Sequence, residues 1–273
     1  AAALAHSMNI PSVNLFLALP FVNINKTWKD LGFSQPLEAN PSVALGTANA
    51  SIYELAIAYA AFANGGKRIQ PKSILTVKTS EGKIIYKGQL TSSGQRVLAE
   101  ETSVMMNAML QKAVTEGTGR ALAAQYGVIM NLAGKTGTSQ DYGDAWFAAY
   151  NKKLVLVTRV GCNLPKVHFS SGAYGSGGAL ALPLVGLTLK AVQKSPELRK
   201  KVDGKFAVLS EDQAQKLACE DRIEDSAFES RMEELFTKPG TTSEKAAKKA
   251  ERELKKGEKE SFFKRLLKKK KKN

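Results

Sequence analysis

The stretch that decides the fold runs from Gly134 to Cys162 and reads GKTGTSQDYGDAWFAAYNKKLVLVTRVGC. It contains two apolar, β-rich runs, Ala145 to Tyr150 and Leu154 to Cys162. Only Asn151-Lys152-Lys153 separates them, and so short a connection makes the two strands antiparallel neighbours. The segment therefore predicts a tightly connected pair of antiparallel strands.

Further strands and helices are expected around this pair. A third β-like run, Val128 to Leu132, continues toward Lys135. Ser51 to Asn64 is predicted to be a helix, because Ser51-x-x-Glu54 has the form of a capping box. Thr102 to Glu116 predicts a second helix. The expected fold class is α+β, an antiparallel sheet packed with helices.

A glycine-rich loop, Ser170 to Gly178, leads into another expected helix, which carries Leu180, Leu184, Leu187 and Ala191 at helical spacing. The apolar stretch from Gly177 to Val192 is shorter than the roughly 20 residues that cross a bilayer, so it predicts a core helix. A short helix is expected at Asp212 to Cys219.

Ile74 to Val77 and Ile84 to Tyr86 predict a surface hairpin around the turn Ser80-Glu81-Gly82-Lys83. The first residues have neither the basic start nor the long apolar region of a signal peptide, so none is expected among them.

Charge is spread unevenly along the 273 residues, whose net charge is +15. The segment from Thr241 to Asn273 holds 14 basic and 5 acidic side chains and is low in complexity, so we predict no fixed fold for it. We divide the chain into residues 1–195, a folded region; 196–240, a polar and acidic appendage; and 241–273, a basic tail.

Metal and redox chemistry find no support in the sequence. Cys162 and Cys219 form no Cys-x-x-Cys pair, although a disulfide between them stays open. His6 and His168 have no second ligand at metal-binding spacing. We therefore expect neither a metal nor a cofactor.

Two short motifs are candidates for chemistry. Lys135-Thr136-Gly137-Thr138 stands where a β-run ends, and Ser7-Met8-Asn9 lies near the start of the chain. Each triplet also has an ordinary structural interpretation: Lys135 as a solvated strand-end lysine, Ser7 as a surface serine, and Asn9 as a helix cap before Pro11. The order and the surroundings of the two motifs favour the functional interpretation.

Together the motifs resemble the Ser-x-Asn and Lys-Thr-Gly motifs of penicillin-binding proteins and serine β-lactamases, whose first motif is a nucleophilic Ser-x-x-Lys. The sequence around the two motifs is similar to that of class A high-molecular-weight penicillin-binding proteins over about residues 4–195. The similar segments are Leu45-Gly46-Thr47, Tyr59 to Gly66, Gly117-Thr118-Gly119-Arg120-Ala121, Gly134 to Ser139 and Asp144 to Tyr150.

This resemblance implies a transpeptidase that crosslinks peptidoglycan by acyl transfer from D-Ala-D-Ala stem peptides and is acylated by β-lactams. By this resemblance Ser7 and Lys135 are expected to take the catalytic roles, with Ser7 relaying a proton to the leaving amine and Lys135 tuning it electrostatically. Asn9, Thr136, Gly137 and Thr138 bind substrate, the backbone N–H of Thr138 being one oxyanion donor.

The first motif departs from the family pattern. The strings Ser80-Glu81-Gly82-Lys83 and Ser261-Phe262-Phe263-Lys264 both come after Ser-x-Asn, the first in a predicted turn and the second in the basic tail. We reject both, so the chain is expected to be an N-terminally truncated and inactive part of the domain, without its nucleophile. A membrane anchor and a glycosyltransferase domain are expected upstream, with the domain on the periplasmic side of the inner membrane.

Three alternatives stay open. A serine β-lactamase usually has Asp where Met8 stands, and a non-catalytic assembly module would keep the same fold. The third alternative is a nucleic-acid binder. The lysines of this chain have no aromatic platform beside them for stacking bases, so no nucleic acid is expected as a partner. For the basic tail, Phe262, Phe263, Leu266 and Leu267 among lysines could form an amphipathic helix on an anionic membrane or wall polymer, or stay a solvated segment.

Overall fold

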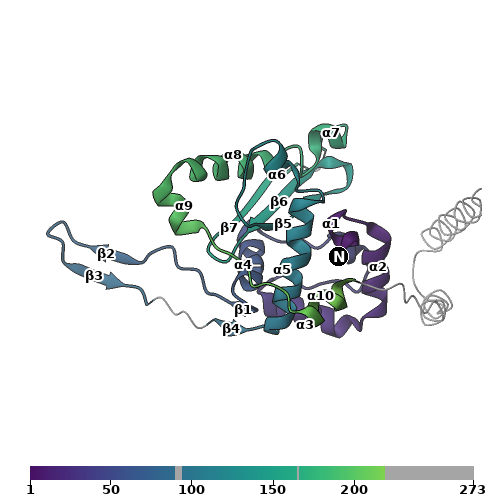
Figure 1. The fold of residues 1–273 in the computed structure, drawn as a ribbon, viewed down its shortest axis with the longest axis horizontal. Helices are drawn as coiled ribbons and strands as arrows, with labels where there is room; N and C mark the ends of the chain where they lie inside the picture. The colour runs from purple at the N-terminus through teal and green to yellow at the C-terminus, as the bar shows by residue number, and fades with distance from the viewer. Residues whose placement is uncertain (90–93, 165, 219–273) are drawn as a thin grey trace, which may run out of the picture. The chain divides into compact units, whose positions relative to one another are not determined.

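The computed structural model describes residues 1–89, 94–164 and 166–218 (Figure 1). The elements, in chain order, are α1 (Ala2–Ala5), α2 (Asn9–Ala18), α3 (Phe21–Leu31), η1 (Pro41–Leu45), α4 (Ile52–Ala63), β1 (Lys67–Arg68), β2 (Thr76–Lys78), β3 (Ile84–Lys87), β4 (Gln95–Arg96), α5 (Glu100–Thr115), α6 (Ala121–Ala124), β5 (Ala133–Thr138), η2 (Gln140–Tyr142), β6 (Asp144–Tyr150), β7 (Val155–Gly161), α7 (Gly172–Gly175), α8 (Ala181–Lys194), α9 (Pro196–Val202) and α10 (Glu211–Ala218).

The central sheet is antiparallel and has the order β5-β6-β7. Lys135 lies opposite Ala148, and Phe147 lies opposite Thr158. Asn151 shapes the turn between β6 and β7, because its side-chain oxygen accepts hydrogen bonds from the backbone N–H groups of Lys153 and Leu154 at 2.8 and 3.0 Å. The predicted strand pair and its tight turn are confirmed.

Helices cover both faces of this sheet (Figure 1). On one face Phe147 packs with Leu182, Val185 and Leu189 of α8, all of them buried. On the other face Tyr150 packs with residues of α4 and α5. Burying each large apolar side chain stabilises the fold by about 1.5–3 kcal/mol. The predicted α+β class, a sheet packed with helices, is confirmed.

A buried polar contact joins the sheet to both helices of its second face. The Tyr150 hydroxyl donates to Oδ1 of Asn107 at 2.8 Å, and Nδ2 of Asn107 donates to the carbonyl of Phe62 at 3.1 Å. Buried polar groups are costly unless they are paired. These two bonds therefore fix how α4, α5 and β6 meet.

The α4 capping box is present as predicted. The Ser51 hydroxyl accepts from the Glu54 backbone N–H at 3.1 Å, and Glu54 accepts in return from the Ser51 backbone N–H at 2.8 Å. The Glu54 carboxylate also accepts from the backbone N–H of Ser34 at 2.8 Å. Its hydrogen bonds to Ser34, and then to Ser51, lower the pKa of Glu54 from 4.5 to about 2.

This carboxylate predicts an acid-dependent loss of stability. Because the folded-state pKa of Glu54 lies below its unfolded value, its contribution is complete above about pH 4.5 and is lost as the pH falls toward 2. Glu54→Gln should cost about 1 kcal/mol at pH 7, a typical value for a helix cap, and less at pH 2. Urea unfolding at both pH values measures the difference. Glu38→Gln, at an exposed position, is the control, and an equal cost of Glu54→Gln at both pH values would contradict the prediction.

One predicted strand is wrong. Residues 128–132 form no strand, and β5 begins only at Ala133. Val128, Met130 and Leu132 are buried while Ile129 is 74% exposed, so the alternation of a strand is real. The backbone nevertheless lacks a neighbouring strand there: Ile129 N–H donates to the Gln193 side chain at 2.7 Å.

The helix expected after the glycine-rich loop is present as α8, and its buried side chains are mostly not those that showed the helical spacing. Leu184 and Leu187 are 48% and 57% exposed, whereas Leu182, Val185 and Leu189 face the sheet. Leucines occupy several sides of this helix, so helical spacing alone could not identify the buried one.

The predicted hairpin is present as β2 and β3, with Ser80 in its turn. Its apolar side chains, including Ile74, Ile84, Ile85 and Tyr86, are exposed, and the hairpin extends away from the central sheet (Figure 1). The turn confirms that Ser80 and Lys83 do not share a helical face.

The chain beyond α8 returns to the sheet. Nδ2 of Asn151 donates to the Val202 carbonyl at 2.9 Å, and the Phe206 ring lies 5.5 Å from that of Tyr150. The helix expected at Asp212 to Cys219 is present as α10. Cys219, Ser261 and the basic tail from Thr241 lie outside the described residues. Across the described ranges, no helix has both the length and the apolar character needed to cross a bilayer.

Candidate active site

The structure brings together the two motifs that the sequence singled out. Nζ of Lys135, on β5, donates a hydrogen bond to Oγ of Ser7, which lies between α1 and α2. The same Nζ donates to the carbonyl of Thr136 at 3.1 Å. The two side chains are 128 positions apart in the sequence, so the contact is a property of the fold.

Burial gives the Lys135 amine a special electrostatic setting. Desolvation lowers the pKa of Lys135, because the charged ammonium loses water that no carboxylate replaces. No Asp or Glu within the described part of the chain forms an ion pair with it. A desolvated lysine in contact with another polar side chain is a candidate functional group.

Ser7 has an unusual backbone. Its φ is +53°, in the left-handed region that non-glycine residues seldom adopt. Hydrogen bonds hold this turn on both sides: Ser7 N–H donates to the Leu4 carbonyl at 3.2 Å, and Met8 N–H donates to that of Ala3 at 2.9 Å. Strained residues persist only where the surroundings fix them, and they concentrate at functional sites.

Asn9 follows as the first residue of α2, and its side chain is exposed. Within the ranges that the structure describes, no hydrogen bond engages its side-chain amide. The amide can therefore both donate to and accept from a ligand.

The remaining motif residues divide between the two faces of β5. Gly137 is on the same face as Lys135, since side chains alternate along a strand. Thr136 and Thr138 are on the opposite face. Oγ1 of Thr136 donates to Oγ1 of Thr118 at 2.7 Å, and Oγ1 of Thr138 accepts from the Gly177 N–H at 3.0 Å. The hydroxyl proton of Thr138 stays available to a ligand.

β5 is the edge strand of its sheet, because among the described strands it pairs only with β6. The other side of its backbone thus presents N–H and C=O groups next to Lys135. An extended peptide can add to such an edge through main-chain hydrogen bonds.

Sequence reasoning missed Thr118, the partner of Thr136. Its segment, Gly117-Thr118-Gly119, enters the sequence analysis only as part of the family resemblance. The signal that could have marked Thr118 is the pair of glycines on either side of it, both of which are buried in the structure.

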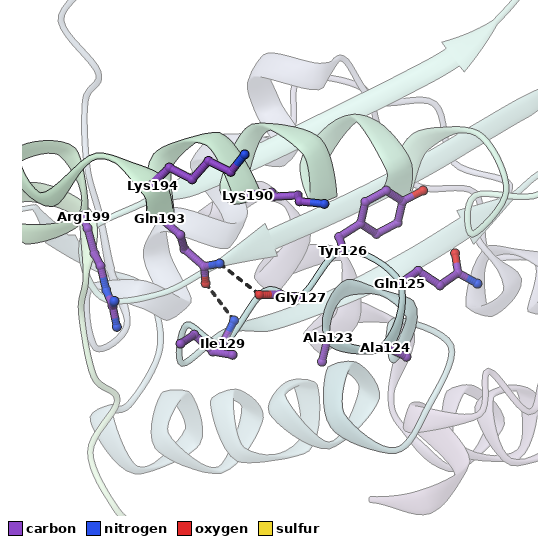
Figure 2. A pocket seen from close by; sticks show the side chains of 10 residues that line it. All are labelled: Ala123, Ala124, Gln125, Tyr126, Gly127, Ile129, Lys190, Gln193, Lys194 and Arg199. Atoms are coloured by element: carbon purple, nitrogen blue, oxygen red, sulfur yellow. Dashed lines mark hydrogen bonds between the residues drawn. The ribbon is translucent and has the colours of Figure 1, made fainter.

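A separate hollow of about 580 Å³ lies between α6 and α8 (Figure 2). Gln193 lines it and joins two other lining residues, because its side chain donates to the Gly127 carbonyl at 3.0 Å and accepts from the Ile129 N–H. Lys190, Lys194 and Arg199 stand around it. None of the motif residues lines this hollow, so it is distinct from the candidate site.

Asp144 has a structural partner. It forms an ion pair with Arg159 of β7 at 2.5 Å.

The described residues contain no group of three His, Cys, Asp or Glu side chains able to hold a metal ion.

Comparison with known proteins identifies the family. The model for the penicillin-binding protein transpeptidase domain matches residues 1–176. Penicillin-binding protein 1B of Escherichia coli (strain K12) is 34% identical over 183 residues, which are 66% of this chain and 21% of the relative.

Solved structures share the fold. Penicillin-binding protein 1A from Haemophilus influenzae has a TM-score of 0.65 at 22% identity, over 76% of this chain and 35% of that one. PonA1 from Mycobacterium tuberculosis, solved in complex with penicillin V, has a TM-score of 0.57 at 20% identity, over 77% of this chain and 59% of that one.

The fold is thus that of the transpeptidase domains of penicillin-binding proteins, which resembles serine β-lactamases. The chain belongs to the penicillin-binding protein transpeptidase family. Its similarity is to the class A proteins 1A and 1B, as the resemblance in the sequence indicated. It spans about a fifth of the length of the curated relatives it matches.

Proposed function

We propose that the chain is part of a serine D-Ala-D-Ala transpeptidase that crosslinks peptidoglycan stem peptides and is acylated by β-lactams. The observation that carries the proposal is the hydrogen bond between Lys135 and Ser7. It joins the two family motifs in one site, on an exposed strand edge that suits a peptide substrate.

Each motif residue then has a role in acyl transfer. Ser7 passes a proton to the leaving amine, and Lys135 sets the electrostatic potential at the Ser7 hydroxyl. Asn9 binds the amide of the substrate. The hydroxyl of Thr138 binds its terminal carboxylate, while the Thr136 hydroxyl, whose proton goes to Thr118, supports the strand beside it. Gly137 lets the substrate backbone approach β5, and Thr138 N–H stabilises the oxyanion.

The nucleophile is assigned to sequence upstream of Ala1. Ser80 lies in the β2–β3 turn and not on a helix, so Lys83 does not stand one helical turn away from it as a Ser-x-x-Lys motif requires. The exposed apolar surface of α2 is consistent with a further part of the domain packing on it, because Ile10 and Leu15 are exposed and none of the ten residues of α2 is buried. We propose that the rest of the transpeptidase domain covers this surface.

The same proposal gives the protein a cellular setting. It acts in the cell envelope, on the periplasmic side of the inner membrane, as part of a bifunctional class A enzyme with a glycosyltransferase domain. Residues 1–195 belong to the transpeptidase domain. The lysines of residues 241–273 suit an anionic membrane or wall polymer, and a solvated segment is the alternative.

Labelling with a fluorescent penicillin tests the proposal. The full-length protein is compared with the 273-residue chain, and both are treated with hydroxylamine to confirm an ester bond. Label on the full-length protein alone is expected. Label on the chain itself would contradict the assignment of the nucleophile, and no label on either would favour a non-catalytic assembly module. Rapid loss of the label by hydrolysis would identify a β-lactamase instead.

A further inference from the structure

The turn that follows α5 packs backbone against backbone on the end of α1. Gly117 is buried there, and a Cβ at this position would lie 2.1 Å from the Ala5 carbonyl oxygen. Thr118 N–H donates to the same carbonyl at 3.2 Å. Only glycine permits this approach, which fixes α1 two residues before Ser7.

The side chain of Thr118 reaches the other half of the site. Its Oγ1 accepts from Oγ1 of Thr136 at 2.7 Å, and Thr136 directly follows Lys135 on β5. One residue therefore touches both backbone segments that carry the Ser7–Lys135 contact: through its N–H the segment before Ser7, and through its hydroxyl the strand of Lys135.

We propose that Thr118 is a positioning residue that holds Oγ of Ser7 within reach of Nζ of Lys135. The proposal rests on the proposed function and adds a residue to it. Ser7 has a left-handed backbone and lies in a short turn, so its position depends on what holds the end of α1. Thr118 ties that end to β5, whereas α1 itself spans only four residues.

Removing the hydroxyl of Thr118 should affect the chemical step more than ligand binding. Thr118→Val keeps the shape of the side chain and its backbone N–H but leaves Thr136 without its partner. We expect the acylation rate constant of the full-length protein with fluorescent penicillin V to fall about tenfold, because small displacements of proton-transfer groups are costly. The dissociation constant of the initial complex should change less than twofold.

Two further variants separate positioning from general stability. Thr118→Ser keeps the hydroxyl and should restore the rate to within about twofold of wild type. Thr158→Val is the matched control: it removes a hydroxyl that donates to the carbonyls of Phe147 and Ala181 at 3.3 and 3.0 Å, on β7 rather than at the site. It should lower the Tm without changing the acylation rate constant.

The outcomes distinguish this inference from the proposed function. If wild type is labelled and Thr118→Val reacts at the same rate, Thr118 has no positioning role although the function stands. A weaker initial complex with an unchanged rate constant would make Thr118 a ligand contact and overturn the inference. Equal losses in Thr118→Val and Thr118→Ser would also contradict it. Absence of label on wild type would refute the proposed function itself.

Discussion

Lys135→Ala is expected to slow the acylation of the full-length protein by penicillin about 10²- to 10³-fold, the usual cost of removing one preorganised electrostatic group from an active site. The amine of Lys135 donates to Ser7, and no carboxylate of the described residues forms an ion pair with it. Its removal leaves the Ser7 hydroxyl without the nearby charge that tunes it. Stopped-flow labelling with a fluorescent penicillin measures the rate constant.

Two other lysine variants sharpen this experiment. Lys135→Arg keeps a positive charge with a different shape, so it should react faster than Lys135→Ala and slower than wild type. Lys153→Ala removes an exposed lysine from the turn between β6 and β7 and should leave the rate constant unchanged. An unaltered rate in Lys135→Ala would show that the charge of Lys135 does not tune the Ser7 hydroxyl.

The second large effect concerns stability. Gly177→Ala is expected to lower the free energy of unfolding by about 3 kcal/mol, because the new methyl group overpacks the sheet. A Cβ there would lie 2.3 Å from the Trp146 carbonyl oxygen and 2.4 Å from that of Gly137. Both contacts are with backbone, so no side chain can move aside. Gly177 also donates to Thr138, and so the change disturbs the candidate site.

The neighbouring glycine supplies the control. A Cβ at Gly178 would meet nothing within 4 Å. Gly178→Ala should therefore change the free energy of unfolding by less than about 0.5 kcal/mol. Urea unfolding of both variants measures the contrast, and equal stabilities of the two would show that the loop before α8 yields to the added methyl group.

The sequence predicted most of the elements because their signals are local. Ser51 and Glu54 form a capping box within one turn, and Asn151 closes a turn with its own neighbours. The sequence was less informative where contacts with residues distant in the chain determine the structure. Residues 128–132 alternate like a strand, yet a side chain of α8 takes the place of a neighbouring strand. The buried stripe of α8 depends on the sheet beneath it.

The candidate site shows the same division. Motif order and family resemblance pointed to Ser7 and Lys135, and the fold brings them into contact. The left-handed backbone of Ser7 had no local signal, because serine rarely adopts it and no glycine marks the position. Thr118 was missed because its importance comes from two contacts, with Ala5 and Thr136, that lie far from it in the sequence.

The β2–β3 hairpin has a consequence for how the molecule fluctuates. Within the described ranges, the hydrogen bonds of its strands and turn stay inside the segment from Lys72 to Gln89. A two-stranded ladder alone is only marginally stable in water. Its amides can therefore exchange with solvent by local opening, at far lower free energy than those of the central sheet. The hairpin can open and close again while Ser7 and Lys135 stay in contact.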